Sequence, residues 1–317
     1  MPVPAEKDIA ALQVGDRITG FYILKDAVVR TSSSGKPFLA GAVSDRTGSI
    51  DLKIWDYGGP VGSADAGRAV KLSGVVTEFK GNLQLIADRI RPVLPEDGFD
   101  KSRLVPVAPI DAEERMREIL ALVDSMEDTD YQSVAREMLS RHGETLRQIP
   151  AAKSVHHSFL SGLLMHTSNM LRLADFLAGQ YAEVIDRSLL LCGTLIHDIM
   201  KEREFVFSDL GLAVDYSPEG QLLGHLVMGA REAAEVAESL GLPEEKSLLL
   251  QHLVLSHHGE PEFGAAVRPQ CPEAELLSSI DLIDSRMEIY AEALQDVPEG
   301  AFSPRVFALD RRVYHHK

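Results

Sequence analysis

The stretch LLLCGTLIHDIMK, residues 189–201, decides the fold of the second half of this 317-residue chain. It opens with an almost entirely apolar run, as expected for a helix buried in the core of a bundle. His197 and Asp198 end that run, so we expect them at the wall or mouth of the core. A buried carboxylate without a partner is costly. An imidazole and a carboxylate can converge on a metal ion, and the dipeptide therefore predicts a cation beside this helix.

Further histidines and aspartates lie on the segments around this stretch. In chain order they are His166, His225, His257, His258, Asp281 and Asp284. With the His-Asp pair they come from five predicted helices and offer only nitrogen and carboxylate oxygen atoms. This donor set suits Mn, Fe, Zn, Ni or Mg, and it excludes a cysteine-rich structural zinc site. The pattern predicts a metal centre inside a helical bundle.

Helical periodicity also runs through the segments on both sides of this stretch. The predicted helices are 113–126, 131–149, 159–180, 187–202, 222–240, 245–258 and 273–294. Asp111 is expected to cap the first helix, with Glu114 completing a capping box. Apolar faces on the 111–148 helices indicate either packing on the rest of the bundle or assembly into a homo-oligomer.

Residues 17–91 have a different pattern, that of a small β-barrel. Five strand-like runs are separated by turn signals, at 17–29, 37–45, 48–56, 69–79 and 83–93. The long connection between the third and fourth runs favours a Greek-key barrel of the OB-fold type. An SH3-like barrel is the alternative. The segment 94–111 is rich in Pro, Asp and Gly and is predicted to be a linker.

An OB barrel binds single strands by stacking bases on aromatic rings and by following the backbone with cations. The candidate nucleic-acid-binding residues of the barrel are Trp55, Phe38, Lys36, Lys53 and Arg30. Further candidates are Phe21, Tyr22, Tyr57, Phe79 and Lys80. Aromatic residues that alternate along small barrels are mostly core residues, so the side of the barrel that each ring faces is left open.

Charge divides the chain into two different parts. Residues 1–97 hold 12 Lys and Arg against 12 Asp and Glu, and residues 98–317 hold 20 against 36. The net charge of −16 therefore comes entirely from the second part. Such an acidic part argues against non-specific binding of polyanions. It fits a domain that gathers divalent cations, or one whose surface acids serve solubility alone.

The compartment is expected to be a reducing cytoplasm. Cys192 and Cys271 are the only cysteines, too few for a disulfide scaffold. The chain has no apolar run of the roughly 18 residues that a membrane span needs, so no membrane partner is expected. Its N-terminus, MPVPAEKDIA, does not have the pattern of a secretory signal.

The ligand order, with Lys201 completing HDIMK, resembles the HD superfamily of metal-dependent phosphohydrolases. With the barrel in front, nearly the whole chain is similar to the YhaM-type 3′-to-5′ exoribonucleases. The segments that carry this likeness are AAKSVHHSFLSGLLMHT (151–167), GQLLGHL (220–226), LLLQHLVLSHHG (248–259), SIDLIDSRM (279–287) and FSPRVFALDRR (302–312). The expected protein is a multidomain α+β chain, in which a small OB-fold barrel precedes an all-α HD-type bundle. The expected domains are the OB-fold at 1–95, a linker with connecting helices at 96–150, the HD domain at 151–300 and a tail at 301–317.

The resemblance implies a role for each site residue. The core metal ligands are His166, His197, Asp198 and Asp281. The histidines that hold a second metal in six-ligand members match His225 and His257, with His258 as the alternative to His257 and Asp198 bridging. The implied cofactors are two divalent ions, with manganese first and Mg, Fe, Co or Ni also compatible.

The implied catalytic residues are Asp198, Lys201 and His157, with His156 as the alternative to His157. A histidine at 156 or 157 would contact the scissile phosphate or protonate the leaving 3′ oxygen. Asp284 is expected to hold a ligand histidine or Arg286, and Arg286 is a further candidate for nucleic-acid binding. Met200 stands where the HDxGK motif commonly has glycine, which leaves the pose of Lys201 open.

The activity implied is a metal-dependent 3′-to-5′ exonuclease for single-stranded RNA, with single-stranded DNA as a further substrate. Three alternatives stay open. One is a phosphohydrolase of small nucleotides with a regulatory barrel, and another is a catalytically inactive adaptor that binds nucleic acid or protein. The third is a di-iron oxygenase, because the HD fold also supports that chemistry with the same ligand order.

Overall fold

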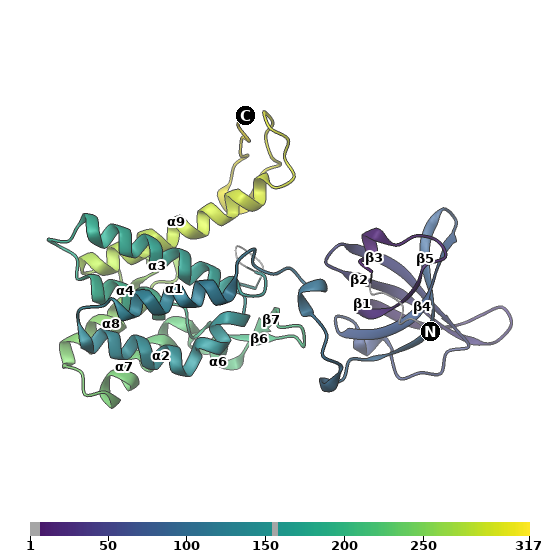
Figure 1. Cartoon of the computed structure of the whole chain (residues 1–317), viewed down its shortest axis with the longest axis horizontal. Coiled ribbons are helices and arrows are strands. Elements are labelled where there is room, and N and C mark those ends of the chain that lie inside the picture. Colours follow the sequence, from purple (N-terminus) through teal and green to yellow (C-terminus); the bar gives the residue numbers. More distant parts are fainter. Residues whose placement is uncertain (1–6, 154–157) are drawn as a thin grey trace. The chain divides into compact units, whose positions relative to one another are not determined.

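Five strands near the N-terminus close into a barrel (Figure 1). They are β1 Arg17–Thr31, β2 Pro37–Asp45, β3 Gly48–Trp55, β4 Ala69–Phe79 and β5 Asn82–Pro92. Their order is β1-β2-β3-β5-β4, and β1 pairs with β4 to close the barrel. The β3–β5 pair is parallel, and the other pairs are antiparallel. This order confirms the OB-fold barrel predicted from the five runs and not the SH3-like alternative.

Two glycines allow the strands of the barrel to approach closely. A Cβ atom at Gly41 would lie 2.1 Å from the backbone oxygen of Asp26, and one at Gly74 would lie 2.4 Å from that of Ile86. The pairing register shifts beside Asp26 in β1 and beside Gly74 in β4. Any other residue would push the strands apart at these two bulges.

The second part of the chain is mainly helical. Its helices are α1 Ala112–Asp124, α2 Thr129–Gln148, α3 Gly162–Gln180, α4 Arg187–Ile196, α5 Lys201–Glu204, α6 Pro218–Leu222, α7 Gly224–Ser239, α8 Glu244–Ser256 and α9 Pro272–Leu294. Short 3₁₀ turns lie at Ile9–Ala11, Ser63–Asp65, Pro95–Asp97, Lys101–Arg103, Pro261–Phe263 and Phe307–Leu309. The computed structural model describes residues 7–153 and 158–317.

Helix α4 is the centre of this bundle. Every residue from Ser188 to Ile196 is buried, and α4 packs against α2, α3, α8 and α9. The helix begins where the Asp186 carboxylate accepts a hydrogen bond from the backbone N–H of Leu189, a standard N-cap. A Cβ atom at Gly193 would lie 2.2 Å from the Leu253 side chain, so α4 and α8 are in close contact. The C-terminal end of α4 therefore lies inside the helical unit.

Helices α1 and α2 belong to the same core as α3 and α4. Met116, Ile119 and Val123 of α1 and Met138 of α2 are buried in one cluster with residues of those helices. Of the two interpretations of the apolar 111–148 faces, packing on the bundle is therefore the one observed. Asp111 caps α1 through the backbone N–H of Glu114, which is the expected half of the capping box.

A hairpin is the one departure from an all-helical second part among the described residues. Strands β6 Phe205–Phe207 and β7 Ala213–Tyr216 pair antiparallel between α5 and α6. The sequence predicts no strand there, because each strand is too short for an alternating pattern to stand out. The C-terminal segment also has some order, with isolated bridges joining Phe302 to Tyr314 and Val306 to Arg311.

The chain divides into two compact units. The barrel unit comprises Met1–Val107 with Ser208–Leu210, and the helical unit comprises Ala108–Phe207 with Gly211–Lys317. Within the described ranges, none of the helices combines the length and the apolarity of a membrane-spanning segment.

Candidate metal centre and nucleic-acid surface

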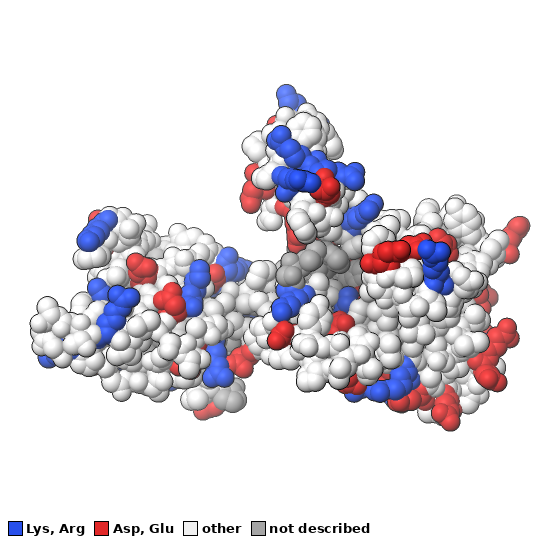
Figure 2. Space-filling model, turned by 180° about the vertical axis from the view of Figure 1, so that it is seen from behind, with Lys and Arg blue, Asp and Glu red and all other residues white. Residues whose placement is uncertain are grey.

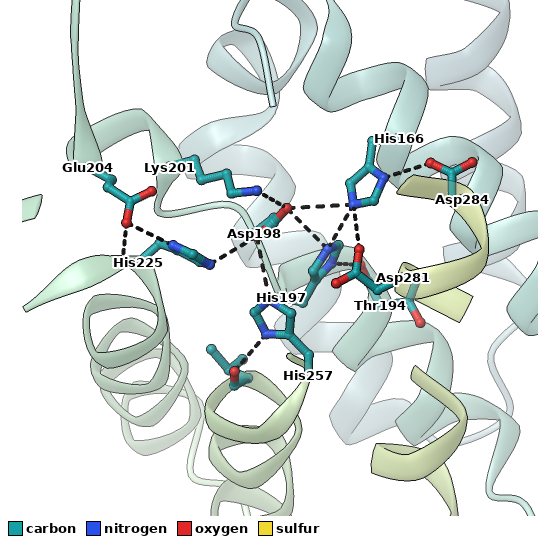
Figure 3. A network of polar contacts seen from close by, with 11 residues as sticks. His166, Thr194, His197, Asp198, Lys201, Glu204, His225, His257, Asp281 and Asp284 are labelled. Atoms are coloured by element: carbon teal, nitrogen blue, oxygen red, sulfur yellow. Dashed lines mark hydrogen bonds and ion pairs between the residues drawn. The ribbon is translucent and has the colours of Figure 1, made fainter. Parts of the chain in front are cut away.

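The end of α4 delivers the His-Asp pair into the helical unit. His197 is the C-cap of α4 and is fully buried, and Asp198 is 2% exposed. Figure 3 shows the Asp198 carboxylate among imidazole rings that come from several helices. These are His166 of α3, His225 of α7 and His257, the C-cap of α8. The structure therefore brings together residues that are distant in the sequence.

The two oxygens of Asp198 face different rings. Oδ2 lies 3.3 Å from Nε2 of His197 and 3.6 Å from Nε2 of His166. Oδ1 lies 3.3 Å from Nε2 of His225 and 3.6 Å from Nε2 of His257. The two carboxylate oxygens of Asp198 therefore each face a different pair of imidazole rings.

The outer nitrogen of each ring is held by a hydrogen bond. The Nδ1 atoms of His197 and His257 donate to the backbone oxygens of Thr194 and Val254, each at 2.7 Å. Since a carbonyl oxygen can only accept, both rings carry their proton on Nδ1. Their Nε2 atoms then face the centre, the orientation in which histidine binds a metal.

The other two rings are held by carboxylates. His166 Nδ1 lies 2.7 Å from Oδ2 of Asp284, and His225 Nδ1 lies 2.9 Å from Oε1 of Glu204. The contact of Asp284 with a histidine was expected, whereas the sequence did not predict that of Glu204. Its only sequence signal is an acid shortly after the His-Asp pair, and nothing in the sequence links it to His225.

Three polar atoms at the centre are buried and have no hydrogen-bond partner within the described residues. They are Asp198 Oδ1, His225 Nε2 and His258 Nδ1. Leaving a buried polar atom unsatisfied costs about 1–3 kcal/mol. The first two are 3.3 Å apart and are both good ligand atoms for a cation. The donor set therefore fits divalent metal ions.

The candidate ligand atoms fall into two groups. His166, His197 and Asp198 offer atoms that all lie within 4.8 Å of one another, and so do His225, His257 and His258. Asp281 Oδ1 joins the first group, 3.3 Å from Nε2 of His166.

Negative charge dominates around His166. Burial lowers the pKa of this imidazole, but its hydrogen bonds with Asp281 and Asp284 outweigh burial and raise the pKa to about 10. In the protein alone this ring therefore holds a proton at neutral pH, which a bound metal ion would have to displace. Burial also raises the pKa of Asp198, but Lys201 and His197 outweigh burial and hold it well below its usual range.

The two adjacent histidines differ in their surroundings. His257 is 1% exposed and points Nε2 at Asp198, like the other rings. The His258 ring lies 4.4 Å from the His257 ring and 5.3 Å from the His225 ring. Burial, and then the two neighbouring rings, lower the pKa of His258 to about 3, so its ring is neutral and able to bind a metal. Both remain predicted ligands, and His257 has the geometry of the others.

Met200 does not displace Lys201. Its φ of −76° and ψ of 2° are open to any residue, so the turn has no need of glycine. The Lys201 ammonium donates to Asp198 Oδ2 at 2.6 Å. Burial lowers the pKa of Lys201, but Asp198 outweighs burial and raises it. This lysine is therefore a cation at the edge of the centre.

A cavity of about 620 Å³ opens over the metal centre. It lies within the size range of small-ligand sites. Its lining includes Lys201, His166, His225, His257, His258 and Asp281, and the aromatic residues Phe205, Tyr216 and Phe263. Arg286 is exposed on α9 and is not among the described residues that line it. His157 and His156 lie outside the described residues.

Aromatic and basic side chains share one outer face of the barrel. The pairing register sets Arg30 opposite Phe38, and Phe38 opposite Trp55, so all three point to the same side. The Phe38 and Trp55 rings are 5.1 Å apart. The Lys53 ammonium lies 4.9 Å from the Trp55 ring and 5.3 Å from the Phe79 ring. Trp55 and Phe79 are each about half exposed.

The remaining barrel candidates have other surroundings. Tyr22 is 1% exposed and Tyr57 is 8% exposed, so the hypothesis that these two rings stack on bases is wrong: they are core residues. Phe21 stacks on Phe99 with centroids 4.8 Å apart. Lys36 is exposed and its ammonium lies 2.9 Å from Asp56.

Family models match parts of both units. The HD domain family matches residues 163–286, and the family of OB-fold nucleic acid binding domains matches residues 23–93. Among solved structures, the HD domain of the phosphodiesterase PgpH from Listeria monocytogenes matches with a TM-score of 0.30 and 16% identity, covering 50% of this chain and 75% of that one. The second OB-fold domain of replication protein A from Methanococcus maripaludis matches with a TM-score of 0.23 and 19% identity, covering 30% of this chain and 100% of that one.

Curated relatives match the chain over nearly its whole length. The 3′-5′ exoribonuclease YhaM of Listeria welshimeri is 34% identical, and the match covers 98% of this chain and 98% of the relative. The protein of the same name from Halalkalibacterium halodurans is 36% identical, with 98% and 96% covered. The chain belongs to the family of YhaM 3′-5′ exoribonucleases.

Proposed function

We propose that this protein is a metal-dependent exonuclease that removes nucleotides from the 3′ end of single-stranded RNA. The observation that carries the proposal is the Asp198 carboxylate, buried among four imidazoles whose Nε2 atoms lie 3.3–3.6 Å from its oxygens. The family of the chain supports the substrate and the direction of cleavage. Single-stranded DNA is a further substrate of the same chemistry.

Two ions, with manganese as the first choice, would be held by this ligand set. His166, His197 and Asp281 would hold one ion, and His225 and His257 or His258 the other, with Asp198 between them. When bound, such ions lower the pKa of a coordinated water and stabilise charge on phosphoryl oxygens. Oxygen and nitrogen ligands suit manganese as well as Mg, Fe, Co or Ni.

The chain's own residues position the reaction. The hydrogen bonds from Nδ1 fix the ring planes, so the ligand geometry exists before the substrate arrives. Lys201 places a positive charge at the edge of the cavity, where it offsets part of the charge on Asp198 and faces an incoming phosphate.

The barrel surface is proposed to hold the strand. Trp55 and Phe79 offer exposed ring faces on which bases stack, with the half-buried Phe38 ring beside Trp55. Lys53 and Arg30 offer cations for the backbone. Lys36 is a further cation of this surface, and its ammonium also contacts Asp56. Arg286 is proposed as an additional backbone contact from α9.

Assembly and compartment stay proposals as well. Homo-oligomer formation has little support from the 111–148 helices, because most of their apolar residues pack in the core of the bundle, although Leu120 is 43% exposed. A cytoplasmic location is proposed from the two free cysteines, Cys192 and Cys271, which suit a reducing environment.

The test is digestion of single-stranded RNA labelled at its 5′ end, with manganese and with EDTA. We expect a ladder that shortens from the 3′ end, is absent with EDTA, and is absent with Asp198→Ala. The matched control is Asp296→Ala, which removes an exposed aspartate of the same unit and should leave the ladder unchanged. Intact RNA beside a protein that carries metal would overturn the proposal and redirect the search to small phosphorylated nucleotides.

A further inference from the structure

The β6–β7 hairpin places an exposed tyrosine in the wall of the cavity. Phe205 and Tyr216 pair directly across the hairpin, with ring centroids 5.3 Å apart. Phe205 is 7% exposed, whereas Tyr216 is 42% exposed, and both line the cavity. The buried Phe205 ring therefore contacts the Tyr216 ring, while much of the Tyr216 ring stays accessible.

The hairpin is anchored directly to the metal centre. Glu204, which accepts the hydrogen bond from His225 Nδ1, immediately precedes Phe205. After β7 the chain returns to the same residue, where the backbone N–H of Ser217 donates to the Glu204 carbonyl at 2.8 Å. A Cβ atom at Gly220 would lie 2.2 Å from that carbonyl oxygen, so the return is tightly packed. The tyrosine thus has a defined position relative to the ligand histidine.

A cation lies beside the tyrosine. The Lys153 ammonium is 5.7 Å from the centroid of the Tyr216 ring and 3.3 Å from Oδ1 of Asp215. Lys153 also lines the cavity. An exposed ring with a neighbouring cation is the combination that binds single strands, because the base stacks on the ring and the phosphate contacts the cation.

We propose that Tyr216 is the stacking platform for a base near the 3′ end of the strand, with Lys153 contacting the adjoining phosphate. This inference rests on the proposed exonuclease function and assigns a nucleotide subsite to the helical unit itself. Every base has a π-face, so the subsite accepts all four bases. It holds the end of the strand over the metal centre.

The first experiment compares kcat/KM on single-stranded RNA for three variants. Tyr216→Ala should lower kcat/KM about tenfold, as expected for the loss of one base–aromatic stack. Tyr216→Phe keeps the ring and should restore most of that loss. Tyr181→Ala is the matched control, since Tyr181 is 56% exposed at the end of α3 and is not among the described residues that line the cavity. It should cleave like the unmodified protein.

The second experiment uses RNAs that lack a single base at the first, second or third position from the 3′ end. For the unmodified protein, loss of the base at one of these positions should lower kcat/KM about tenfold. On the RNA that lacks this base, Tyr216→Ala should not lower kcat/KM further, because there is no base for the Tyr216 ring to stack on. Metal content, measured on the same samples, should not change.

Three outcomes overturn the inference while leaving the proposed function intact. One is that Tyr216→Ala cleaves intact RNA as fast as the Tyr181→Ala control. Another is that Tyr216→Ala lowers kcat/KM by the same factor on every RNA that lacks a base. The third is loss of bound metal in Tyr216→Ala, which would show that the hairpin acts through Glu204. If the unmodified protein with manganese leaves all RNAs intact, the proposed function itself fails.

Discussion

The carboxylate of Glu204 lies behind His225 and binds it twice. It accepts hydrogen bonds from the ring Nδ1 at 2.9 Å and from the backbone N–H at 3.2 Å. Burial raises the pKa of Glu204, but the contacts with His225 outweigh burial and lower it, so the group is charged. A charged acceptor makes the opposite ring nitrogen a stronger metal ligand.

Glu204→Gln should therefore weaken metal binding. Removing such a partner typically lowers metal affinity about 10–100-fold. Titration of the metal-free protein with manganese measures the effect. Glu238→Gln is the matched control, because Glu238 is an exposed glutamate on the same helix as His225. Equal affinities for the two variants would contradict the role assigned to Glu204.

Met200 belongs to the core although it follows the His-Asp pair so closely. Its side chain is 1% exposed and packs in the main cluster of the helical unit. Met200→Ala should lower the free energy of unfolding by about 2–5 kcal/mol. Met287→Ala, at a methionine that is 55% exposed, should change it by no more than about 0.5 kcal/mol. Urea unfolding of both variants checks this, and similar midpoints would contradict the packing role.

At the scale of elements, the metal centre is a consequence of how helices pack around α4. His166 comes from α3, His225 from α7, His257 from the end of α8 and Asp281 from α9. Of these elements, α3, α8 and α9 all pack directly on α4. Because α4 is buried along nearly its whole length, a shift of any of these neighbours moves a candidate ligand.

A second polar contact joins α2 to α5, outside the metal centre. His142 Nδ1 lies 2.7 Å from Oε1 of Glu202, and its Nε2 lies 3.5 Å from Oε1 of Glu232. Arg141 also contacts Glu232. Burial lowers the pKa of His142, but Glu202, and then Glu232, outweigh burial and raise it above its ordinary value.

This contact should make stability depend on pH. A group whose pKa is raised by folding stabilises the protein below its unfolded pKa of about 6.5, and that contribution is lost as pH rises through the folded pKa. The difference in unfolding free energy between the unmodified protein and His142→Gln should thus be largest near pH 6 and should shrink toward pH 9. Denaturant unfolding across this range measures it. A difference that grows with pH would contradict the assignment.

At the scale of the whole molecule, charge does not select the substrate by itself. The barrel part is neutral and the rest of the chain carries the −16. On the face shown in Figure 2, basic and acidic side chains are interspersed over much of the surface, and basic ones gather on the C-terminal segment after α9. Binding of a strand must therefore depend on local ring and cation contacts, such as those around Trp55 and Lys53.

Trp55 offers a direct readout of strand binding to the barrel. It is the only tryptophan of the chain and is 51% exposed. Single-stranded RNA should quench its fluorescence even in EDTA, because the barrel needs no metal to stack bases. Trp55→Phe and Trp55→Ala should lower RNA affinity in that order, with a loss of about tenfold for alanine. Binding of RNA can be followed separately by a label on the RNA. Unchanged tryptophan fluorescence at saturating RNA would show that Trp55 is not part of the RNA-binding surface.

Local patterns determined the element types and most of the candidate ligands. Alternation over five runs predicted the barrel, because one face of each strand is buried. The apolar run before His197 predicted a core helix with polar residues at its inner end. The β6–β7 hairpin escaped prediction, because strands of three and four residues are too short to show a period.

The sequence by itself therefore determined that a barrel is followed by a helical unit with a His and Asp centre, since periodicity and residue chemistry are local properties. Only the tertiary structure decided which groups hold the rings, because such pairs are distant in the chain: His166 and Asp284 are separated by 118 positions. It also decided that Tyr22 is core whereas Trp55 is exposed. Both strands show alternation, and only the closure of the barrel determines which face is inside.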